Sequence, residues 1–235
     1  MDIINTYRSE PKLAVYDLLG IDLTAVQSLI FSEIWSCDRA LEIISRGGGK
    51  TFLLGLAATL KCMLYPGYKV CITAPVFRQA KLVFSEIERL YTLPRVNKSC
   101  NKRPFRTDSS CHLNFKPVSY LDMSNIEVLH LSRASADAGR FDLVLVDEAS
   151  YVPVENLKLL DEKSDKLILM STGFYDTNPM WELVNCGYET RMTPYYLFPD
   201  GFFDKNNISE AQRIMSDSDF RMEYEASIVK GRERN

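Results

Sequence analysis

The chain has 235 residues, of which 46% are hydrophobic and 25% are charged, and its formal net charge is −3. This length predicts one large domain or two small ones with a substantial apolar core. A mildly acidic chain has no overall basic footprint for nucleic acid, so any such contact needs a local patch. No apolar run reaches membrane-spanning length and the N-terminus lacks a secretory pattern, which predicts a cytosolic protein without a membrane partner.

The N-terminal residues 1–23 predict a short amphipathic helix over 12–19 that ends at Gly20. Thr24 then has the character of an N-cap for a helix over 25–35. Gln27 lies in the first turn of that helix, and its amide group can both donate to and accept from an adenine edge. The alternative for Gln27 is an ordinary solvated helix residue.

A glycine-rich segment lies between an apolar run at 41–44 and a helical run at 52–63; it consists of Ser45, Arg46, Gly47, Gly48, Gly49, Lys50 and Thr51. A glycine loop between a strand and a helix is typical of a phosphate-binding loop, because glycine backbone amides can approach phosphate oxygens closely. Lys50 would then reach the β- and γ-phosphates, and the Thr51 hydroxyl would ligate Mg²⁺. The pattern departs from the common one at Ile44, where a glycine is usual, and the alternative is a glycine-rich turn without a ligand.

The middle of the chain predicts a buried strand over 69–74, a turn at Pro75 and a long helix over 77–90. Basic residues then gather in a predicted loop: Arg95, Lys98, Lys102, Arg103 and Arg106. A mobile basic loop suits phosphate contacts with a DNA duplex, and a solvated loop is the alternative. Two short paired strands are predicted at 112–115 and 126–131, with His130 in the second, followed by a small-residue loop at 132–140 that carries Arg133 and Arg140.

Residues 141–148 predict a fully buried parallel strand that ends in Asp147 and Glu148. Ligands of open α/β sheets bind at the carboxyl ends of the strands. Asp147 would therefore hold Mg²⁺, and Glu148 would polarise the water that attacks the γ-phosphate. A strand that merely ends in acids at a surface turn is the alternative.

The next strand is predicted over 166–170 and ends in Ser171, Thr172 and Gly173, whose hydroxyls could sense the γ-phosphate. The remaining chain predicts a helix at 179–186, a strand at 189–197, a loop at 200–207, and helices at 209–215 and 220–229. The polar end at 230–235 has the composition of a linker.

Four motifs together resemble the ATPase domain of the large terminase subunit of tailed bacteriophages: SRGGGKT, TAPVFRQA, LVLVDEA and MSTG. The resemblance covers residues 23–229 and implies an α/β P-loop NTPase of the ASCE type, with a mostly parallel sheet flanked by helices on both faces. It implies an ATPase domain over 1–229 with an N-terminal helical extension over 1–23. Residues 230–235 would begin a linker to a nuclease domain that this chain lacks.

The resemblance also implies the ligands and partners: ATP, Mg²⁺, double-stranded DNA, self-association into a ring on a portal protein, and a small terminase subunit. The activity would be ATP hydrolysis that drives DNA into a procapsid in the host cytoplasm. By position, Lys50 and Thr51 match the phosphate and metal residues, Asp147 the metal shell and Glu148 the catalytic carboxylate.

Further roles follow from the same resemblance. Gln27 matches the adenine-reading glutamine and Arg46 an arginine that senses the γ-phosphate in cis. Three residues match the coupling motif: Ser171, Thr172 and Gly173. For the arginine that a neighbouring subunit would offer, Arg140 is the first candidate and Arg133 the second.

Two other functions stay open at this point. One is a helicase-like or repair DNA-dependent ATPase, although the chain is short for the second motor domain that such helicases need. The other is a nucleotide-gated DNA-binding clamp without useful turnover, which the adjacent acids Asp147 and Glu148 argue against.

Overall fold

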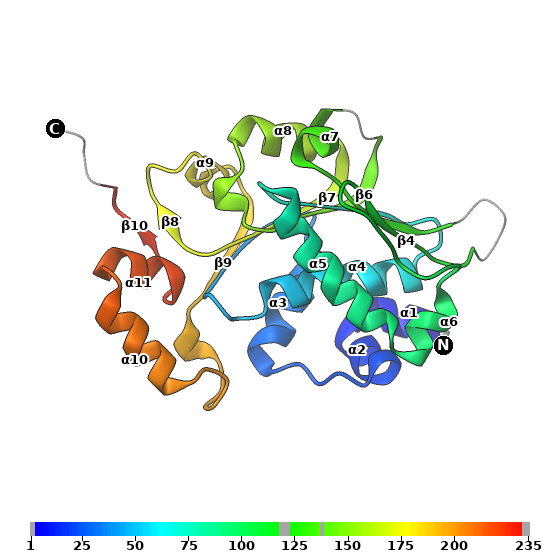
Figure 1. Cartoon of the computed structure of the whole chain (residues 1–235), viewed down its shortest axis with the longest axis horizontal. Helices are drawn as coiled ribbons and strands as arrows, with labels where there is room; N and C mark the ends of the chain where they lie inside the picture. The colour runs from blue at the N-terminus through cyan, green and yellow to red at the C-terminus, as the bar shows by residue number, and fades with distance from the viewer. Residues whose placement is uncertain (1–2, 118–122, 137–138, 232–235) are drawn as a thin grey trace.

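A computed structural model describes residues 3–117, 123–136 and 139–231, and Figure 1 shows how they are arranged. The main strands are β1 (Arg39–Ile44), β2 (Lys69–Thr73), β3 (Phe105–Arg106), β4 (Cys111–Asn114), β5 (Asn125–Val128), β6 (Phe141–Val146), β7 (Ser164–Ser171) and β9 (Glu189–Thr193). They form one eight-stranded sheet in the order β3-β4-β5-β2-β6-β7-β1-β9.

Six neighbouring strands of this sheet, from β5 to β9 in the sheet order, are parallel to one another. The pairs β3–β4 and β4–β5 are antiparallel. The predicted mostly parallel sheet is therefore confirmed. Because parallel strands end at the same edge, the residues that follow β1, β2, β6 and β7 meet there. That edge receives the glycine loop, Pro75, Asp147 and Thr172.

Helices cover both faces of the sheet. The helices of the described ranges are α1 (Ile3–Ser9), α2 (Pro11–Leu19), α3 (Ala25–Ser36), α4 (Lys50–Leu64), α5 (Phe77–Tyr91), α6 (Pro94–Ser99), α7 (Leu131–Ala136), α8 (Val154–Glu162), α9 (Trp181–Asn185), α10 (Lys205–Ile214) and α11 (Asp217–Glu223), of which α10 and α11 lie at one end of the molecule. None of those in the described ranges has the length and apolar character to cross a membrane.

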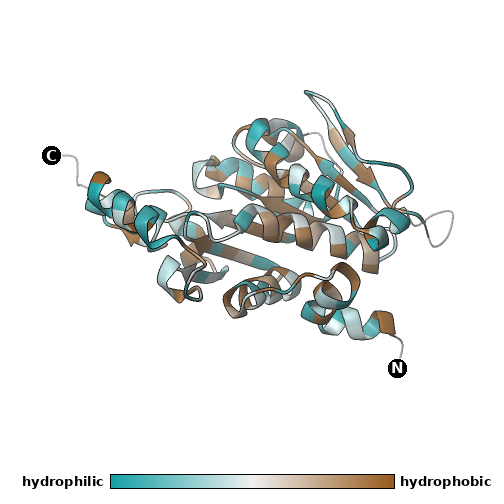
Figure 2. Cartoon of the chain, turned by 60° about the horizontal axis from the view of Figure 1, so that its bottom comes forward, coloured by the Kyte–Doolittle hydropathy of each residue, from teal (hydrophilic) through white to brown (hydrophobic). Residues whose placement is uncertain are grey.

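Alternation along the strands divides the core into two layers, which Figure 2 shows as an apolar sheet between amphipathic helices. On β1, Ala40 and Ile44 pack with the layer of α1 to α6. Leu41 and Ile43 point to the opposite layer, which includes residues of α8 and α9. A strand buried on both faces needs apolar residues at almost every position, which β1, β6 and β7 have.

The C-terminal residues form a small unit at one end of the molecule, around α10 and α11 (Figure 1). Its own apolar cluster contains Ile208, Ala211 and Phe220. A second, two-stranded sheet of β8 (Phe174–Tyr175) and β10 (Ile228–Val229) joins this unit to the segment after β7.

Two predicted loops are wrong in their first parts, where the structure has short helices. Residues 94–99 form α6, which begins at Pro94, a favoured first residue of a helix, and Val96 is fully buried beneath it. Residues 131–136 form α7, in which Ala134 is fully buried, and His130 precedes this helix rather than lying in a strand. Both helices exist because tertiary packing overrides weak local preference.

The predicted helix over 220–229 is wrong in its second half. Helix α11 ends at Glu223, Ala226 has a φ of 51° in the left-handed region, and Ile228 pairs with Phe174 in β8. The structure also begins α10 at Lys205, inside the predicted loop over 200–207, because Asp204 caps the helix by accepting from the Asn206 N–H.

Candidate active site

The glycine loop after β1 has the backbone shape that its sequence requires. Gly47 and Gly49 have φ values of 80° and 94°, which L-residues adopt rarely. A Cβ on Gly48 would lie 2.6 Å from the Ile44 Cγ2. Ile44 is itself fully buried in the core. The unusual residue at the first position of the motif is therefore a core residue, and Gly48 provides the space for it.

Lys50 begins α4 and is buried beneath the loop. Its ammonium donates to the carbonyl oxygens of Ile44 at 3.1 Å and Ser45 at 3.4 Å. Burial lowers the pKa of Lys50, whereas the nearby Glu148, Asp147 and Glu223 carboxyl groups raise it. The buried Lys50 ammonium therefore provides a fixed positive charge beneath the loop, which can bind the phosphates of a nucleotide.

Thr51 and Asp147 meet at the sheet edge although 96 positions separate them. The Thr51 hydroxyl donates to the Asp147 Oδ2 at 3.2 Å. Asp147 is only 3% exposed, and its backbone N–H donates to the Thr73 carbonyl between β6 and β2. A hydroxyl and a carboxylate at this distance are oxygen ligands that suit Mg²⁺ together with phosphate oxygens.

Glu148 has a φ of 52°, a left-handed conformation that is unusual for a residue other than glycine. Its N–H donates to the Asp147 Oδ1 at 3.1 Å, which ties the two acids together. Burial raises the pKa of Glu148, and the Lys50 ammonium opposes that shift. Strained backbone of this kind persists where the surroundings over-determine it, often at functional sites.

Gln27 lies beside the loop, as the predicted adenine contact requires. Its Nε2 would be 3.1 Å from a Cβ on Gly49, and the residue is 8% exposed. Gln27 and Thr24 form a reciprocal capping box, in which the Gln27 Oε1 accepts from the Thr24 N–H. The amide oxygen is thus already used, so the NH₂ group is the part of Gln27 that faces the loop.

Ser45 and Arg46 complete the loop. The Ser45 hydroxyl is buried and, among the described residues, has no hydrogen-bond partner. Arg46 is exposed, its guanidinium forms no ion pair within the part of the chain that the structure describes, and it is close enough to influence the pKa of Lys50 and Glu148. Arg46 is therefore available to an incoming anion, whereas Ser45 is fully buried in this structure.

The end of β7 and the residues after it also lie at this edge, one strand away from Asp147. Ser171 is fully buried and its hydroxyl accepts from the Ser150 N–H at 3.4 Å. Thr172 is 4% exposed, and the Gly173 N–H donates to the Met222 carbonyl at 2.8 Å. This segment therefore links the acidic strand end to the C-terminal unit.

Arg140 and Arg133 are not brought to the site of their own chain. Arg140 precedes β6, whereas Asp147 follows it, so the two lie at opposite edges of the sheet. The Arg140 guanidinium donates to the Asp165 Oδ1 at 2.9 Å. Arg133 lines the same cavity of about 350 Å³ as Arg140, next to Phe141. An arginine in this position could act only on a neighbouring copy.

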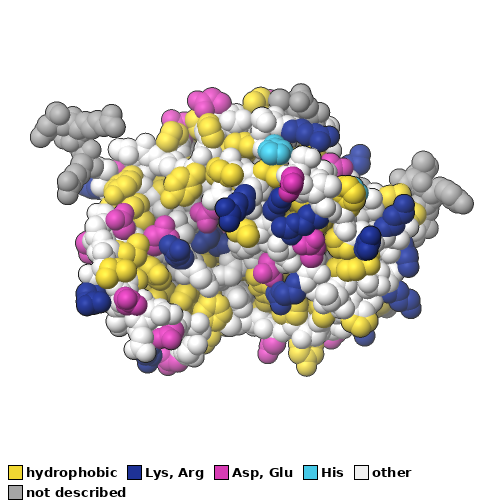
Figure 3. Space-filling view, viewed as in Figure 1, with side chains coloured by type: hydrophobic (Ala, Val, Ile, Leu, Met, Phe, Trp, Pro, Cys, Tyr) yellow, Lys and Arg dark blue, Asp and Glu magenta, His cyan; other side chains and the backbone are white. Residues whose placement is uncertain are grey.

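The basic run divides into paired and unpaired residues. Arg95 donates to the Asp17 carbonyl, and Arg106 pairs with Glu88. The others are exposed and, in the described ranges, form no ion pair: Lys98, Lys102 and Arg103. Figure 3 shows Lys and Arg side chains on the side of the molecule where α6 lies.

Three residues of the C-terminal unit contact the loop, and reasoning from the sequence missed them. Phe203 would be 3.2 Å from a Cβ on Gly47, and Phe198 would be 3.0 Å from one on Gly48. The Glu223 carbonyl accepts from the Arg46 N–H at 2.6 Å. Residues this far from the loop along the chain leave no spacing signal in the sequence.

A glycine loop lies between β1 and α4, and its lysine is buried among acids. A second strand, β6, is followed beside this loop by Asp147 and Glu148. These features define a class of protein, the P-loop NTPases. A family model described as "RNA cytidine acetyltransferase NAT10/TcmA, helicase domain" matches residues 43–175, more than half of the chain, and the chain belongs to this family of helicase-type domains.

The predicted resemblance to phage large terminases is confirmed by further comparisons. A curated relative, the large terminase subunit of Escherichia phage T5, is 26% identical over 211 residues, which cover 80% of this chain and 44% of that protein. This chain therefore spans less than half of that relative's length.

Two solved structures show the same fold. A mutant of the Thermus phage P74-26 large terminase ATPase domain is 20% identical, with a TM-score of 0.70 over 94% of this chain and 100% of that one. The large terminase of the HK97 bacteriophage is 14% identical, with a TM-score of 0.69 over 94% of this chain and 55% of that one.

Proposed function

We propose that this chain is the ATP-hydrolysing motor domain of a phage large terminase and that hydrolysis drives double-stranded DNA into a procapsid. One observation carries the proposal: the Thr51 hydroxyl contacts the Asp147 carboxylate beside the buried Lys50 ammonium. A large terminase of the same fold, from a thermophilic bacteriophage, was solved with ADP and with ATP-gamma-S, which supports a nucleotide at this edge.

The residues fit ATP with Mg²⁺. Thr51 and Asp147 would hold the cation, whose chemistry is to neutralise charge on the phosphate oxygens. In the part of the chain that the structure describes, no group of three His, Cys, Asp or Glu residues could hold a metal alone. Mg²⁺ would therefore depend on phosphate and water oxygens for its remaining ligands, as is usual at nucleotide sites.

The other side chains divide the remaining work. Lys50 and the loop amides bind the phosphates, and the Gln27 NH₂ donates to the adenine edge. Glu148 accepts a hydrogen bond from the attacking water and orients it. Arg46 contributes positive charge at the γ-phosphate from the same subunit.

Phosphate release at saturating MgATP tests this proposal. Glu148→Ala removes the group that orients water, so we expect turnover to fall at least 10²-fold while ATP affinity stays within about twofold. Lys50→Ala should lower both. Omission of Mg²⁺ should abolish hydrolysis by the unaltered chain. Full turnover by the Glu148 variant would refute the assignment.

The packaging role reaches beyond the hydrolysis site. We propose that copies assemble as a ring on a portal protein in the host cytoplasm, with a small terminase subunit as a further partner. The test is ATP-dependent protection of duplex DNA inside procapsids by the longer protein to which such a motor domain belongs. If ATP is hydrolysed but no DNA is protected, the assignment as an ATPase stands and the assignment as a packaging motor is refuted.

The family match to a helicase domain supports a second candidate, a DNA- or RNA-dependent ATPase that unwinds strands. A strand-displacement assay with a labelled duplex distinguishes the two functions. The terminase assignment expects translocation along duplex DNA without release of a strand. A released strand in proportion to the ATP consumed would favour the helicase assignment.

A further inference from the structure

The end of α11 presents three consecutive carbonyl groups to three different parts of the site. The Met222 carbonyl accepts from the Gly173 N–H at 2.8 Å, and the Glu223 carbonyl accepts from the Arg46 N–H at 2.6 Å. The Tyr224 carbonyl accepts from the Tyr195 N–H at 2.9 Å. We call residues 222–224 the junction turn.

The junction turn uses carbonyls that a helix end leaves without intrahelical partners. Their donors follow β1, β7 and β9, three strands that are distant in sequence and adjacent in the sheet. The packing is close, because a Cβ on Gly173 would lie 2.2 Å from the Ser227 carbonyl oxygen. One turn therefore connects the phosphate loop after β1 with the segments after β7 and β9.

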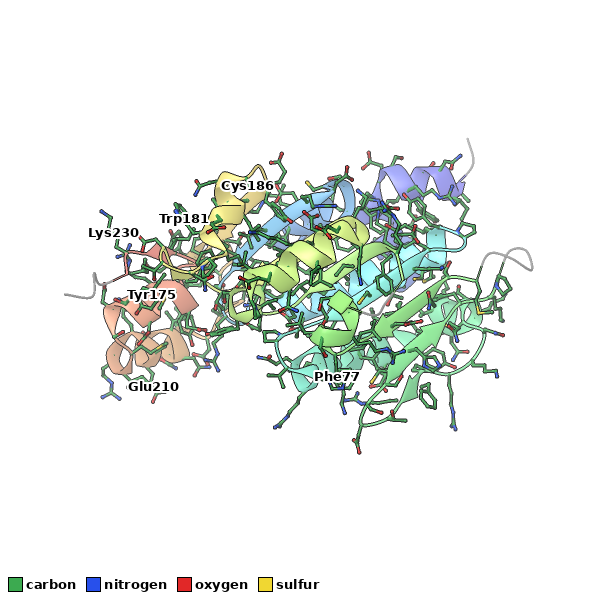
Figure 4. All side chains as sticks on the ribbon, turned by 90° about the horizontal axis from the view of Figure 1, so that it is seen from above. Phe77, Tyr175, Trp181, Cys186, Glu210 and Lys230 are labelled. Atoms are coloured by element: carbon green, nitrogen blue, oxygen red, sulfur yellow. The ribbon has the colours of Figure 1, made fainter. Side chains whose placement is uncertain are left out.

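The Glu223 side chain places a negative charge at the same point. Glu223 lines a cavity of about 380 Å³ together with Ser150, Tyr151 and Gly173. Burial raises the pKa of Tyr151, and Glu223 contributes to that rise. Its charge also raises the pKa of Lys50. Figure 4 shows Tyr175, which lines the same cavity, beside the C-terminal helices.

We propose that Glu223 is a further residue of the nucleotide site, which competes with the terminal phosphate for the loop. Its carbonyl accepts from the Arg46 N–H at 2.6 Å, and Glu223 lines the cavity beside Ser150 and Gly173. A triphosphate brings oxygens to the same groups and repels the carboxylate, which moves the junction turn away and releases the Gly173 N–H. Glu223 is a positioning residue in this account and has no part in bond cleavage.

This inference rests on the proposed nucleotide site. It predicts discrimination between nucleotides, because the terminal phosphate approaches the carboxylate most closely. Repulsion between like charges in a partly buried site corresponds to about 3- to 10-fold in affinity. ADP, which lacks that phosphate, should be affected less than about twofold.

The experiment is calorimetric titration of MgATPγS and MgADP into the unaltered chain, Glu223→Gln and Glu225→Gln. Glu225 is the matched control, because it is two residues away and pairs with Arg221 at 3.8 Å. We expect Glu223→Gln to bind ATPγS about 3- to 10-fold more tightly, with ADP affinity nearly unchanged, and Glu225→Gln to match the unaltered chain.

Hydrogen exchange of the unaltered chain gives a readout that needs no variant. ATPγS should increase exchange at Gly173 and across residues 222–229, and ADP should do so less. The inference is overturned if Glu223→Gln binds ATPγS no more tightly than the unaltered chain, or if ATPγS leaves hydrogen exchange unchanged. The proposed nucleotide site still stands in that case, provided that the unaltered chain binds nucleotide and Lys50→Ala does not. Failure of the unaltered chain to bind ATPγS would instead refute the proposed function.

Discussion

Among the described residues, buried ionisable side chains also lie outside the nucleotide site, at Lys61 on α4 and Glu42 on β1. Glu42 is fully buried between β7 and β9. Burial and the facing Glu33 carboxylate raise the pKa of Glu42 to about 9. Glu33 also pairs with Arg191 on β9, so this cluster joins α3, β1 and β9. Glu42 is therefore protonated at neutral pH.

Protonated Glu42 makes the stability of the fold depend on pH. Between its ordinary pKa of 4.5 and the raised value of about 9, the unfolded chain loses this proton and the folded chain keeps it. Stability from this group is fully present below the lower value and is lost as pH rises through the window. From about pH 5.5 to about pH 8.5 the loss should be on the order of 2–4 kcal/mol.

Glu42→Gln should remove this dependence, because a neutral amide needs no proton. Thermal unfolding at the two pH values measures it: we expect the variant to exceed the parent in Tm by about 5 °C or more at the higher pH, and by little at the lower. Exposed Glu210→Gln is the control and should follow the parent. If the Tm of the parent does not fall relative to that of Glu42→Gln when the pH is raised, Glu42 does not carry the proton assigned to it.

At the scale of elements, the C-terminal unit is held against the sheet by few but close contacts. The pair β8 and β10 contains two residues in each strand, and Gly173 lies directly before it. A Cβ at Gly173 would also lie 2.8 Å from the Met222 Cα. Backbone atoms cannot move aside as a flexible side chain can, so this glycine sets how closely α11 approaches.

Gly173→Ala should therefore separate the C-terminal unit from the sheet. Overpacking of this kind costs about 1–3 kcal/mol. We expect a lower Tm and faster proteolytic cleavage within residues 199–229. Gly139→Ala is the matched control, because a Cβ there would contact nothing within 4 Å. Equal cleavage rates for the two variants would show that the packing at Gly173 is not limiting.

At the scale of the whole molecule, the charged groups on the surface that have few partners within the chain are candidates for contacts with other chains. Arg140 is exposed and pairs only with Asp165 among the described residues, an exposed contact that adds little to stability. Arg140 and Asp147 lie at opposite ends of β6, so Arg140 is placed to act on the nucleotide site of a neighbouring subunit and not on its own. The unpaired basic residues near α6 are likewise free for a partner with phosphate groups.

Arg140→Ala should leave nucleotide binding by a single chain unchanged and should lower the assembly-stimulated turnover by about 10³-fold or more. Asp165→Asn is the matched control, because it breaks the same ion pair and keeps the arginine. Steady-state hydrolysis as a function of protein concentration measures the effect. If Arg133→Ala has this phenotype and Arg140→Ala does not, the second candidate takes the role.

Lys102→Ala with Arg103→Ala should weaken duplex DNA binding regardless of sequence. Two lost phosphate contacts should reduce the slope of log affinity against log salt by about 2. Fluorescence anisotropy over a range of salt concentrations measures this slope. Lys205→Ala on α10, at the other end of the molecule, should leave it unchanged, and an unchanged slope for the double variant would remove this surface from the DNA interface.

Local sequence determined much of this protein. Alternating and continuous apolar runs predicted β1, β2, β6 and β7, because strands buried on both faces need such residues. The glycine loop with Lys50 and Thr51, and the acids at the end of β6, could be read from short segments, because backbone geometry and strand ends are local properties.

Tertiary structure alone decided the rest. Helices α6 and α7 are too short to form by themselves and depend on buried contacts of Val96 and Ala134. The 3.2 Å contact of Thr51 with Asp147, the distance of Arg140 from the site and the approach of Glu223 to Arg46 join residues far apart in the chain. Such pairings follow from strand order and packing, which no spacing along the sequence encodes.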